Sequence, residues 1–269
     1  MSAPIGILDS GLGGLSILNE VRQSLPNESV IYFGDSAWCP YGAKEAHEIQ
    51  QRVFKVTDFL IEQGCKLIVV ACNSATIAAV EALRATYPLP FVGMEPGVKP
   101  AAAITKTGTI GVLATEASLA GEKFHRLLSS HANGITVITR PCPSFVTLVE
   151  SGELSGPHAQ RLVEKEVTPL IEAGADTLVL GCSHYPFLRP LIEATAGPNI
   201  KILDTGAAVT KHIASLITPH TNGQATYQIY TSGDLSQLQK SLPSLCPNLE
   251  AQTMQISENS GAFTTVKHT

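Results

Sequence analysis

The segment that decides the fold occurs twice, as EQGCKLIVVACNS at residues 62–74 and as EAGADTLVLGCSH at residues 172–184. Each copy has a glutamate, a glycine two residues later, an apolar run, a small residue, and then a cysteine followed by polar residues. Cys72 and Cys182 are 182 − 72 = 110 residues apart, and the two glutamates have the same offset, 172 − 62 = 110. A strand that leads into a cysteine therefore occurs at equivalent places in two halves of the chain.

Two further pairs of segments keep nearly the same register. They are PIGILDSGLGG (4–14) with TIGVLATEASL (109–119), and FVGMEPG (91–97) with IKILDTG (200–206). Short apolar runs alternate with helical patterns such as residues 45–62 and 158–173, which indicates parallel sheets covered on both faces. Pro169 is expected to kink or shorten the second of these helices. Shared strand–helix patterning without duplication is an alternative explanation of the repeat.

We therefore expect an α/β fold of two related, doubly wound parallel-sheet domains that face each other about a pseudo-dyad, with the active site in the cleft between them. The first domain is expected at residues 1–95 plus 208–269 and the second at 96–207. Within 208–269 we expect a helix, the strand YQIYT (227–231), a further helix, and a tail at 250–269 with no assigned role.

Composition excludes several classes of function. The chain has 269 residues, 44% of them hydrophobic and 15% charged, so it is globular rather than disordered. The net charge is −5 and no long basic run occurs, which argues against a nucleic-acid partner. The apolar runs are too short to span a membrane, and the first residues do not resemble a signal peptide. A cytoplasmic location is the resulting expectation.

The six cysteines include no C-x-x-C pair, so neither a zinc site nor any other metal site is expected. Disulfides are not expected in a reducing cytosol. Cys65, Cys142 and Cys246 fit the ordinary role of a small buried hydrophobic residue. Cys72 and Cys182 differ because each follows a strand at the edge of the sheet where ligands bind in open α/β folds. Each also stands just before an expected helix start, with Asn73, Ser74 and Ser183 as capping candidates.

Two facing thiols suit the inversion of a carbon acid. One group removes a proton from one face and the other returns a proton to the opposite face, and a helix N-terminus stabilises the thiolate that this requires. His184, two residues after Cys182, is either a proton partner or an ordinary cleft-lining histidine. Glu150, after a proline-rich turn, is on composition alone more often a solvated surface charge.

The loop DSGLGG (9–14) partly fits a dinucleotide-binding fingerprint, but its last position is Ser16, and Asp9 would repel a pyrophosphate. Asp35 lies where a ribose-binding acid would be. An acid at position 9 suits an ammonium group better, or a proton relay to a thiol. The next loop, GDSAWCPYGAK (34–44), is expected to expose Tyr41 in a turn.

Five motifs in order, ILDSGLGGLS, DSAWCPYG, VVACNSAT, GMEPGVKPA and LVLGCSHYP, resemble those of the glutamate racemases of the aspartate/glutamate racemase superfamily. The resemblance covers residues 4–233, and it implies interconversion of L- and D-glutamate without cofactor or metal, through Cys72 and Cys182. It also implies supply of D-glutamate for peptidoglycan, and a homodimer. Trp38 stands where arginine is common, and the N-terminus lacks the extension of members that a cell-wall precursor activates.

The resemblance also implies roles for other residues. Asp9 and His184 would assist the two cysteines, and Glu150 would contribute to catalysis. The residues that would hold the substrate are Asp9, Ser10, Tyr41, Gly42, Asn73, Ser74, Thr115, Ser118, Ser183 and His184.

Three alternatives remain open at this point. An aspartate racemase of the same superfamily is one, although His184 after the second cysteine favours glutamate. A nucleotide-binding or regulatory protein would explain DSGLGG but not the paired cysteines. A non-catalytic interaction protein is the third, and fold alone does not decide among them.

Overall fold

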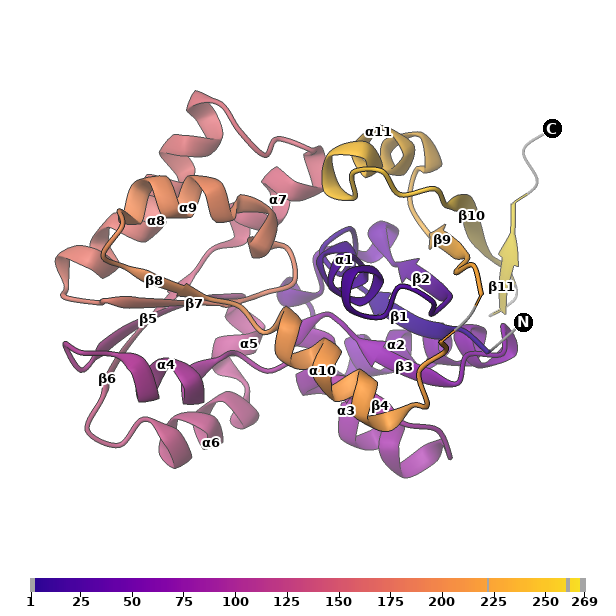
Figure 1. Cartoon of the computed structure of the whole chain (residues 1–269), viewed down its shortest axis with the longest axis horizontal. Coiled ribbons are helices and arrows are strands. Elements are labelled where there is room, and N and C mark those ends of the chain that lie inside the picture. Colours follow the sequence, from indigo (N-terminus) through magenta and orange to yellow (C-terminus); the bar gives the residue numbers. More distant parts are fainter. Residues whose placement is uncertain (1–2, 222, 260–261, 267–269) are drawn as a thin grey trace. The chain divides into compact units, whose positions relative to one another are not determined.

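The computed structural model describes residues 3–221, 223–259 and 262–266. The chain folds into two compact units, one within Met1–Met94 and Gly206–Thr269 and the other Glu95–Thr205 (Figure 1). These bounds differ by one or two residues from those expected from the sequence. Each unit is built around its own largely parallel sheet.

The first unit has the sheet order β11-β10-β9-β2-β1-β3-β4 over the residues that the structure describes, and only β11 is antiparallel to its neighbour. Its strands are β1 (Ile5–Asp9), β2 (Val30–Gly34), β3 (Leu67–Val70), β4 (Phe91–Gly93), β9 (Tyr227–Thr231), β10 (Gln252–Asn259) and β11 (Ala262–Thr265). Its helices are α1 (Leu15–Ser24), α2 (Ala46–Glu62), α3 (Asn73–Thr86), α10 (Gly206–Leu216) and α11 (Leu235–Leu245), with short 3₁₀ turns η1 (Ser36–Trp38) and η2 (Tyr41–Ala43).

The second unit has the all-parallel order β6-β5-β7-β8. Its strands are β5 (Thr109–Ala114), β6 (Thr136–Pro141), β7 (Thr177–Gly181) and β8 (Lys201–Leu203). Its helices are α4 (Val98–Ile104), α5 (Glu116–Ala120), α6 (Glu122–His131), α7 (Pro143–Ser151), α8 (Pro157–Glu172) and α9 (Arg189–Ala196), with the 3₁₀ turn η3 (Tyr185–Leu188).

The two sheets share one topology. The order β2-β1-β3-β4 in the first unit corresponds to β6-β5-β7-β8 in the second, with the earliest strand second in each order. β3 and β7 therefore occupy equivalent positions, and these are the strands of the repeated cysteine segment. The expected relation between two α/β halves is confirmed at the level of topology.

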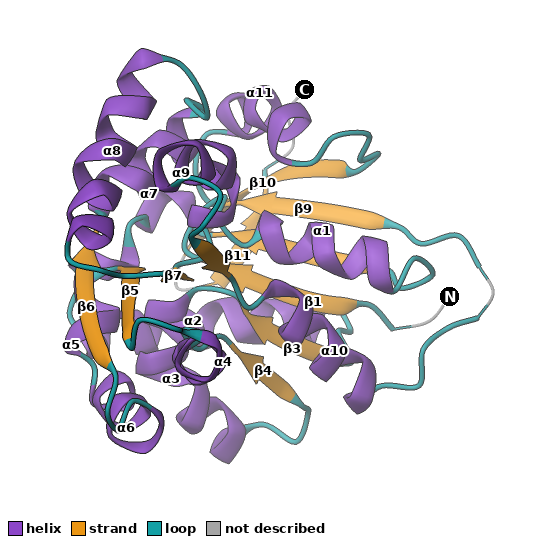
Figure 2. Cartoon of the chain, turned by 60° about the vertical axis from the view of Figure 1, so that its left-hand side comes forward, coloured by secondary structure: helices purple, strands orange, loops and turns teal. Residues whose placement is uncertain are grey.

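Helices cover both faces of each sheet because the central strands are apolar throughout. β1, β2, β3 and β7 are buried along their whole lengths. In the first unit α1 and α10 cover one face, and α2 and α3 cover the other (Figure 2). In the second unit α8 and α9 pack together on one side of the sheet, and α4 and α6 pack together on the other (Figure 1).

One sequence expectation about elements is wrong, and another is wrong in part, since Pro169 was expected either to kink or to shorten its helix. The tail at 250–269 contains β10 and β11, which extend the first sheet, although residues 260, 261 and 267–269 of that tail lie outside the described residues. Pro169 does not shorten α8, which runs on to Glu172. The proline removes only one backbone bond near the end of the helix, and buried Val163, Val167 and Leu170 hold this face against the core.

No helix among the described residues is both apolar enough and long enough to cross a membrane.

Candidate active site

In the first unit, the end of β1 lies against the segment that leads into the first cysteine. β1 and β3 are paired neighbours, and the Ala71 N–H donates to the Leu8 carbonyl over 2.8 Å. Gly14 packs against both segments and leaves no room for a side chain, since a Cβ built there would lie 2.7 Å from the Cβ of Asp9 and 3.0 Å from that of Ala71. Asp9 is thereby fixed beside the residue that precedes Cys72, with 1% of its surface exposed.

Cys72 is itself the N-cap of α3. Its backbone is extended, and its Sγ accepts the Ala75 N–H over 3.5 Å. A thiolate at this place is stabilised by the helix dipole and by the N–H groups of the first turn, of which that of Ala75 donates to the sulfur. The expectation that Asn73 or Ser74 caps the helix is wrong, because Cys72 already has the cap geometry and those two residues form the first helical positions.

Asn73 and Ser74 are buried beside Cys72, each with 3% of its surface exposed. Among the described residues, no hydrogen-bond donor lies within reach of the side-chain oxygen of Asn73. A buried polar atom without a partner is costly, so such atoms mark places where a ligand or a water is expected. Ser10, which follows Asp9, is buried as well, with 4% exposed.

Tyr41 lies in η2, followed directly by Gly42, and only 1% of its surface is exposed. The expectation that its loop exposes it is wrong, because its hydroxyl donates to Asp35 Oδ2 over 2.6 Å. Burial, together with the charge of Asp35, raises the pKa of Tyr41 well above its usual value. The hydroxyl therefore stays protonated and remains a hydrogen-bond donor at neutral pH.

Asp35 is fully occupied by the protein itself. Arg52 Nε and one terminal nitrogen of its guanidinium bind the two carboxylate oxygens at 2.7 Å each, and the Ser232 hydroxyl donates to Oδ1 over 2.6 Å. An acid used in this way does not bind a ribose, so the nucleotide-binding alternative loses its support. Sequence reasoning missed Arg52. The signal available was an arginine on the apolar face of a helix, which buries a charge that needs a partner.

In the second unit, a cysteine, a histidine and a glutamate lie in series. Cys182 Sγ lies 3.7 Å from His184 Nδ1, and His184 Nε2 lies 2.7 Å from Glu150 Oε1. His184 is 2% exposed and the Glu150 side chain 22%, so the reading of Glu150 as a solvated surface charge is wrong. The carboxylate orients the imidazole and stabilises its protonated form. Ser183 Oγ lies 3.5 Å from the same Nδ1.

The backbone after Cys182 differs from the one expected. An α-helix does not begin there; instead a turn leads into η3, and α9 starts only at Arg189. Pro186 lacks an N–H and restricts the residue before it, which favours the tighter turn. The N-cap of η3 is His184 and not Ser183.

Tyr185 anchors this turn to the core of the second unit. This role was not predicted from the sequence. Its side chain is fully buried, and its hydroxyl lies 3.0 Å from the carbonyl oxygens of both Ala114 and Cys142. The Ala114 carbonyl is at the end of β5, and the Cys142 carbonyl directly follows β6. Its ring also packs edge-on against Phe145 of α7, the helix that carries Glu150.

Thr115 follows β5, the strand paired with β7, and Ser118 lies in α5, the helix that comes next. Ala114 pairs with Gly181, so the residues that follow them, Thr115 and Cys182, leave the sheet at neighbouring positions. Thr115 caps α5, its hydroxyl donates to Ser118 Oγ over 2.8 Å, and the Ser118 N–H donates back over 3.2 Å. Ser118 is completely buried.

The structure divides the predicted site residues between the two units, with Asp9, Cys72, Thr115 and Cys182 at or just after the carboxyl ends of strands. The first unit holds Asp9, Ser10, Tyr41, Gly42, Cys72, Asn73 and Ser74, and the second holds Thr115, Ser118, Glu150, Cys182, Ser183 and His184.

The three other cysteines expected to be small core residues are buried. Burial raises the pKa of Cys65 and of Cys246 to about 12. The pKa of Cys142 is raised further, by burial and then by the charge of Glu166. These thiols stay protonated at neutral pH and are poor nucleophiles and poor bases.

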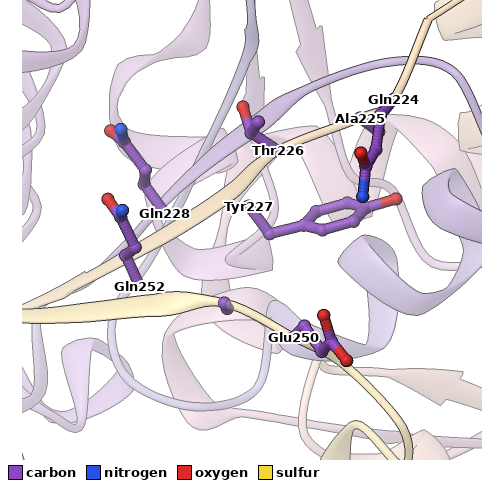
Figure 3. Close-up of a pocket in the computed structure, with 8 residues that line it drawn as sticks. Gln224, Ala225, Thr226, Tyr227, Gln228, Glu250 and Gln252 are labelled. Atoms are coloured by element: carbon purple, nitrogen blue, oxygen red, sulfur yellow. The ribbon is translucent and has the colours of Figure 1, made fainter.

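A separate open hollow of about 450 Å³ lies between the amino ends of β9 and β10. Figure 3 shows the Tyr227 ring in it, near Gln224 and Glu250. Because these strands are parallel, their amino ends lie on the side of the first sheet opposite to the carboxyl ends, where Asp9 and Cys72 are found. The hollow is therefore not part of the candidate active site.

Comparison with known proteins places these features in a family. Residues 14–213 match the family model described as Asp/Glu/Hydantoin racemase. The chain belongs to this family.

Within the family the chain is similar to glutamate racemases. It is 49% identical to the glutamate racemase of Herpetosiphon aurantiacus over 243 residues, 88% of this chain and 95% of the relative. It superimposes on a Bacillus anthracis glutamate racemase with a TM-score of 0.87 at 29% identity, covering 97% of this chain and 98% of that one. It also superimposes with a TM-score of 0.85 at 29% identity on the Escherichia coli glutamate racemase in complex with L-glutamate and the activator UDP-MurNAc-Ala. That match covers 94% of this chain and 98% of the other.

Proposed function

We propose that this chain interconverts L-glutamate and D-glutamate by a two-base mechanism in which Cys72 and Cys182 act on opposite faces of the α-carbon. The observation that carries the proposal is the pair of thiols at equivalent places, after β3 and after β7, in two sheets of the same strand order. Each thiol also has its own polar support, whereas burial raises the pKa of the three remaining buried cysteines. The close relatives are glutamate racemases, which supports glutamate as the substrate.

In one direction, one thiolate removes the α-proton and becomes a thiol, while the other thiol gives its proton to the opposite face and becomes a thiolate. The C–H electron pair remains on the α-carbon between the two steps and forms the new C–H bond. In the reverse direction the roles exchange, so each enantiomer needs both sulfurs. The reaction has no redox change, and protons balance without a cofactor or a metal.

The first unit supports Cys72 through the start of α3 and through Asp9. Asp9 lies beside the residue that precedes Cys72, and we assign its carboxylate to the substrate ammonium group and to proton exchange with this thiol. Asn73 and Ser74 would bind the substrate next to it, and the unpartnered oxygen of Asn73 supports this role. Ser10, Tyr41 and Gly42 would complete the substrate contacts of this unit.

The second unit supports Cys182 through His184, which Glu150 orients. The imidazole accepts a proton from the thiol or returns one to it, and the carboxylate stabilises the imidazolium that forms. Thr115, Ser118 and Ser183 would supply hydroxyl and N–H donors to the substrate carboxylates.

The setting follows from the chemistry. D-glutamate is a building block of bacterial peptidoglycan, and its supply is the role we assign. Two thiols that must stay reduced favour the cytoplasm. We further propose a homodimer, as in many members of the family.

Incubation of the purified protein with L-glutamate, and in parallel with L-aspartate, followed by chiral chromatography, tests the proposal. We expect D-glutamate without added cofactor, and no D-aspartate. Formation of D-aspartate alone would make the protein an aspartate racemase. No reaction of either amino acid with folded protein would defeat the proposal.

A further inference from the structure

A buried arginine connects the Tyr41 loop to the C-terminal strands. Arg52 of α2 is 4% exposed, and its guanidinium binds both oxygens of Asp35 at 2.7 Å. Its other terminal nitrogen binds Glu258 of β10. Its faces lie against two rings, with its central carbon 5.0 Å from the centre of Trp38 and 4.8 Å from that of Phe263.

Two partners of Arg52, Asp35 and Trp38, belong to the loop at 34–44. Asp35 begins that loop, directly after β2, and its carboxylate accepts the Tyr41 hydroxyl at 2.6 Å. Trp38 belongs to the same loop and stacks on the guanidinium. The loop is thus held at two points by one arginine, and the arginine is held in turn by Glu258.

A charge of this kind does not stay buried without compensation. Burial lowers the pKa of Arg52, but the hydrogen bonds and charge of Asp35, and then of Glu258, outweigh this and raise it above its usual value. The hydrogen bond from Lys55, and then that from Arg52, lowers the pKa of Glu258. Arg52 and Glu258 are therefore ionised at neutral pH, and removal of a carboxylate partner leaves the arginine undercompensated.

We infer that Glu258 and Arg52 are positioning residues, which order the loop carrying Tyr41 and Gly42 for substrate binding. This inference deepens the proposed function and rests on it, because Tyr41 and Gly42 are assigned there to the substrate. It gives the C-terminal strands a role in the reaction although they lie beyond residues 14–213, the part that matches the family model.

The chain offers a matched control for the same carboxylate. Glu258 Oε1 also binds Lys55 Nζ at 2.6 Å, and the Lys55 side chain is 45% exposed. The pair is exposed on both sides, since the Glu258 side chain is 31% exposed, and exposed pairs of this kind contribute little to stability. Glu258→Gln weakens the contact with Arg52, whereas Lys55→Gln removes a charge of the same network and leaves that contact in place.

The experiment compares Glu258→Gln, Arg52→Lys and Lys55→Gln with the unmodified protein. Steady-state racemisation of glutamate gives KM and kcat, and hydrogen–deuterium exchange gives the protection of residues 34–44. Loosening a loop that binds substrate and transition state alike raises KM and leaves kcat nearly unchanged. We expect KM to rise roughly fivefold in Glu258→Gln, and by more in Arg52→Lys because an ammonium cannot bind Asp35 through two bonds. Lys55→Gln should match the unmodified protein.

Faster exchange of residues 34–44 together with a raised KM in Glu258→Gln, but not in Lys55→Gln, supports the inference. Equal changes in both variants, or faster exchange with an unchanged KM, overturns it. Melting temperatures separate a local effect from general unfolding. If the unmodified protein does not racemise glutamate, the proposed function fails by that result, and exchange in the loop still decides whether Glu258 and Arg52 order it.

Discussion

Cys72 and Cys182 follow equivalent strands, yet their neighbours differ. Cys72 caps an α-helix and accepts a backbone N–H at 3.5 Å, close to the strand end that carries Asp9. Cys182 enters a turn and a 3₁₀ helix, and its sulfur lies 3.7 Å from a histidine that a glutamate orients. One thiol is supported by backbone dipoles and a carboxylate, the other by an imidazole and a carboxylate.

The comparison separates what the repeated topology supplies from what local residues supply. The strand order places both sulfurs at the carboxyl edge of a sheet, whereas the acid/base partners come from side chains that the two halves do not share. The two enantiomers of glutamate have equal free energies, so kcat/KM must be the same in both directions whatever the partners are. The different acid/base partners of Cys72 and Cys182 must therefore give the same kcat/KM for the two enantiomers.

The largest expected effect comes from removing either sulfur. Cys72→Ser and Cys182→Ser should each lower kcat/KM by roughly 10³-fold, because a hydroxyl is a far weaker acid than a thiol and each direction needs both groups. Chiral assays started from L-glutamate and from D-glutamate measure this. Full turnover of either enantiomer in either variant would show that one thiol is dispensable.

A smaller loss is expected when the support of Cys182 is weakened. Glu150→Gln should reduce kcat/KM by roughly 10- to 100-fold, since an amide neither fixes the imidazole tautomer nor stabilises its charge. The matched control is Glu153→Gln, because Glu153 binds the exposed His158 at 2.9 Å in the same unit. Similar losses in the two variants would mean that charge in this unit matters, rather than the His184 contact.

The two halves can also be compared at the residues just before β3 and β7, where a substitution changes the free energy of unfolding. Lys66 and Asp176 are equivalent, 176 − 66 = 110, and they have opposite charges. Lys66 binds the buried Glu28 at 2.6 Å. Asp176 instead accepts the Lys106 and Thr107 N–H groups, at 2.6 and 2.9 Å.

The Asp176 contacts make a pH-dependent contribution. Burial raises the pKa of Asp176, but hydrogen bonds from Thr105 and from two backbone N–H groups outweigh this and lower it from 3.8 to about 2. The carboxylate therefore stabilises the fold above its unfolded pKa, and this contribution is lost as the pH falls from about 4 through about 2. Asp176→Asn should cost about 1 kcal/mol in the free energy of unfolding at pH 7. Urea titrations at pH 7 and pH 3 should show a smaller difference at pH 3, and a larger one there would reverse the assigned sign.

The smallest effect is expected at the core thiols. Cys65 and Cys246, with pKa values near 12, should resist alkylation by iodoacetamide at pH 8 in the folded protein, as should Cys142. Peptide mass spectrometry after a short exposure measures the labelling, with protein in urea as the control. Rapid labelling of these residues in folded protein would show that burial does not suppress their reactivity.

The sequence predicted the central strands and the place of both cysteines because these depend on local signals. Unbroken apolar runs such as LIVV and TLVL end at small residues, and that pattern identifies a buried strand wherever it occurs. β10 and the edge strand β11 were missed because they carry mixed polar side chains, as in QTMQISEN and AFTT, rather than an unbroken apolar run.

The Asp35 network could not be predicted in the same way. Arg52 lies 17 residues from Asp35 and 206 residues from Glu258, so nothing local signals either contact. The burial of Tyr41 follows from that network and was missed with it. The cap at Cys72 was misassigned because serine and asparagine are the usual caps, whereas a thiol with extended backbone geometry serves here.

The central claim is that two thiols act on opposite faces of one carbon, and isotope transfer in D2O tests it most directly. L-glutamate, and separately D-glutamate, are converted to a small extent, and both the product and the remaining substrate are analysed by chiral separation and mass detection. The account predicts α-deuterium in the product and protium in the remaining substrate, in both directions, because the group that removes the proton is not the one that returns it. A product that keeps its original α-proton would show that a single group carries the proton across, which contradicts the account.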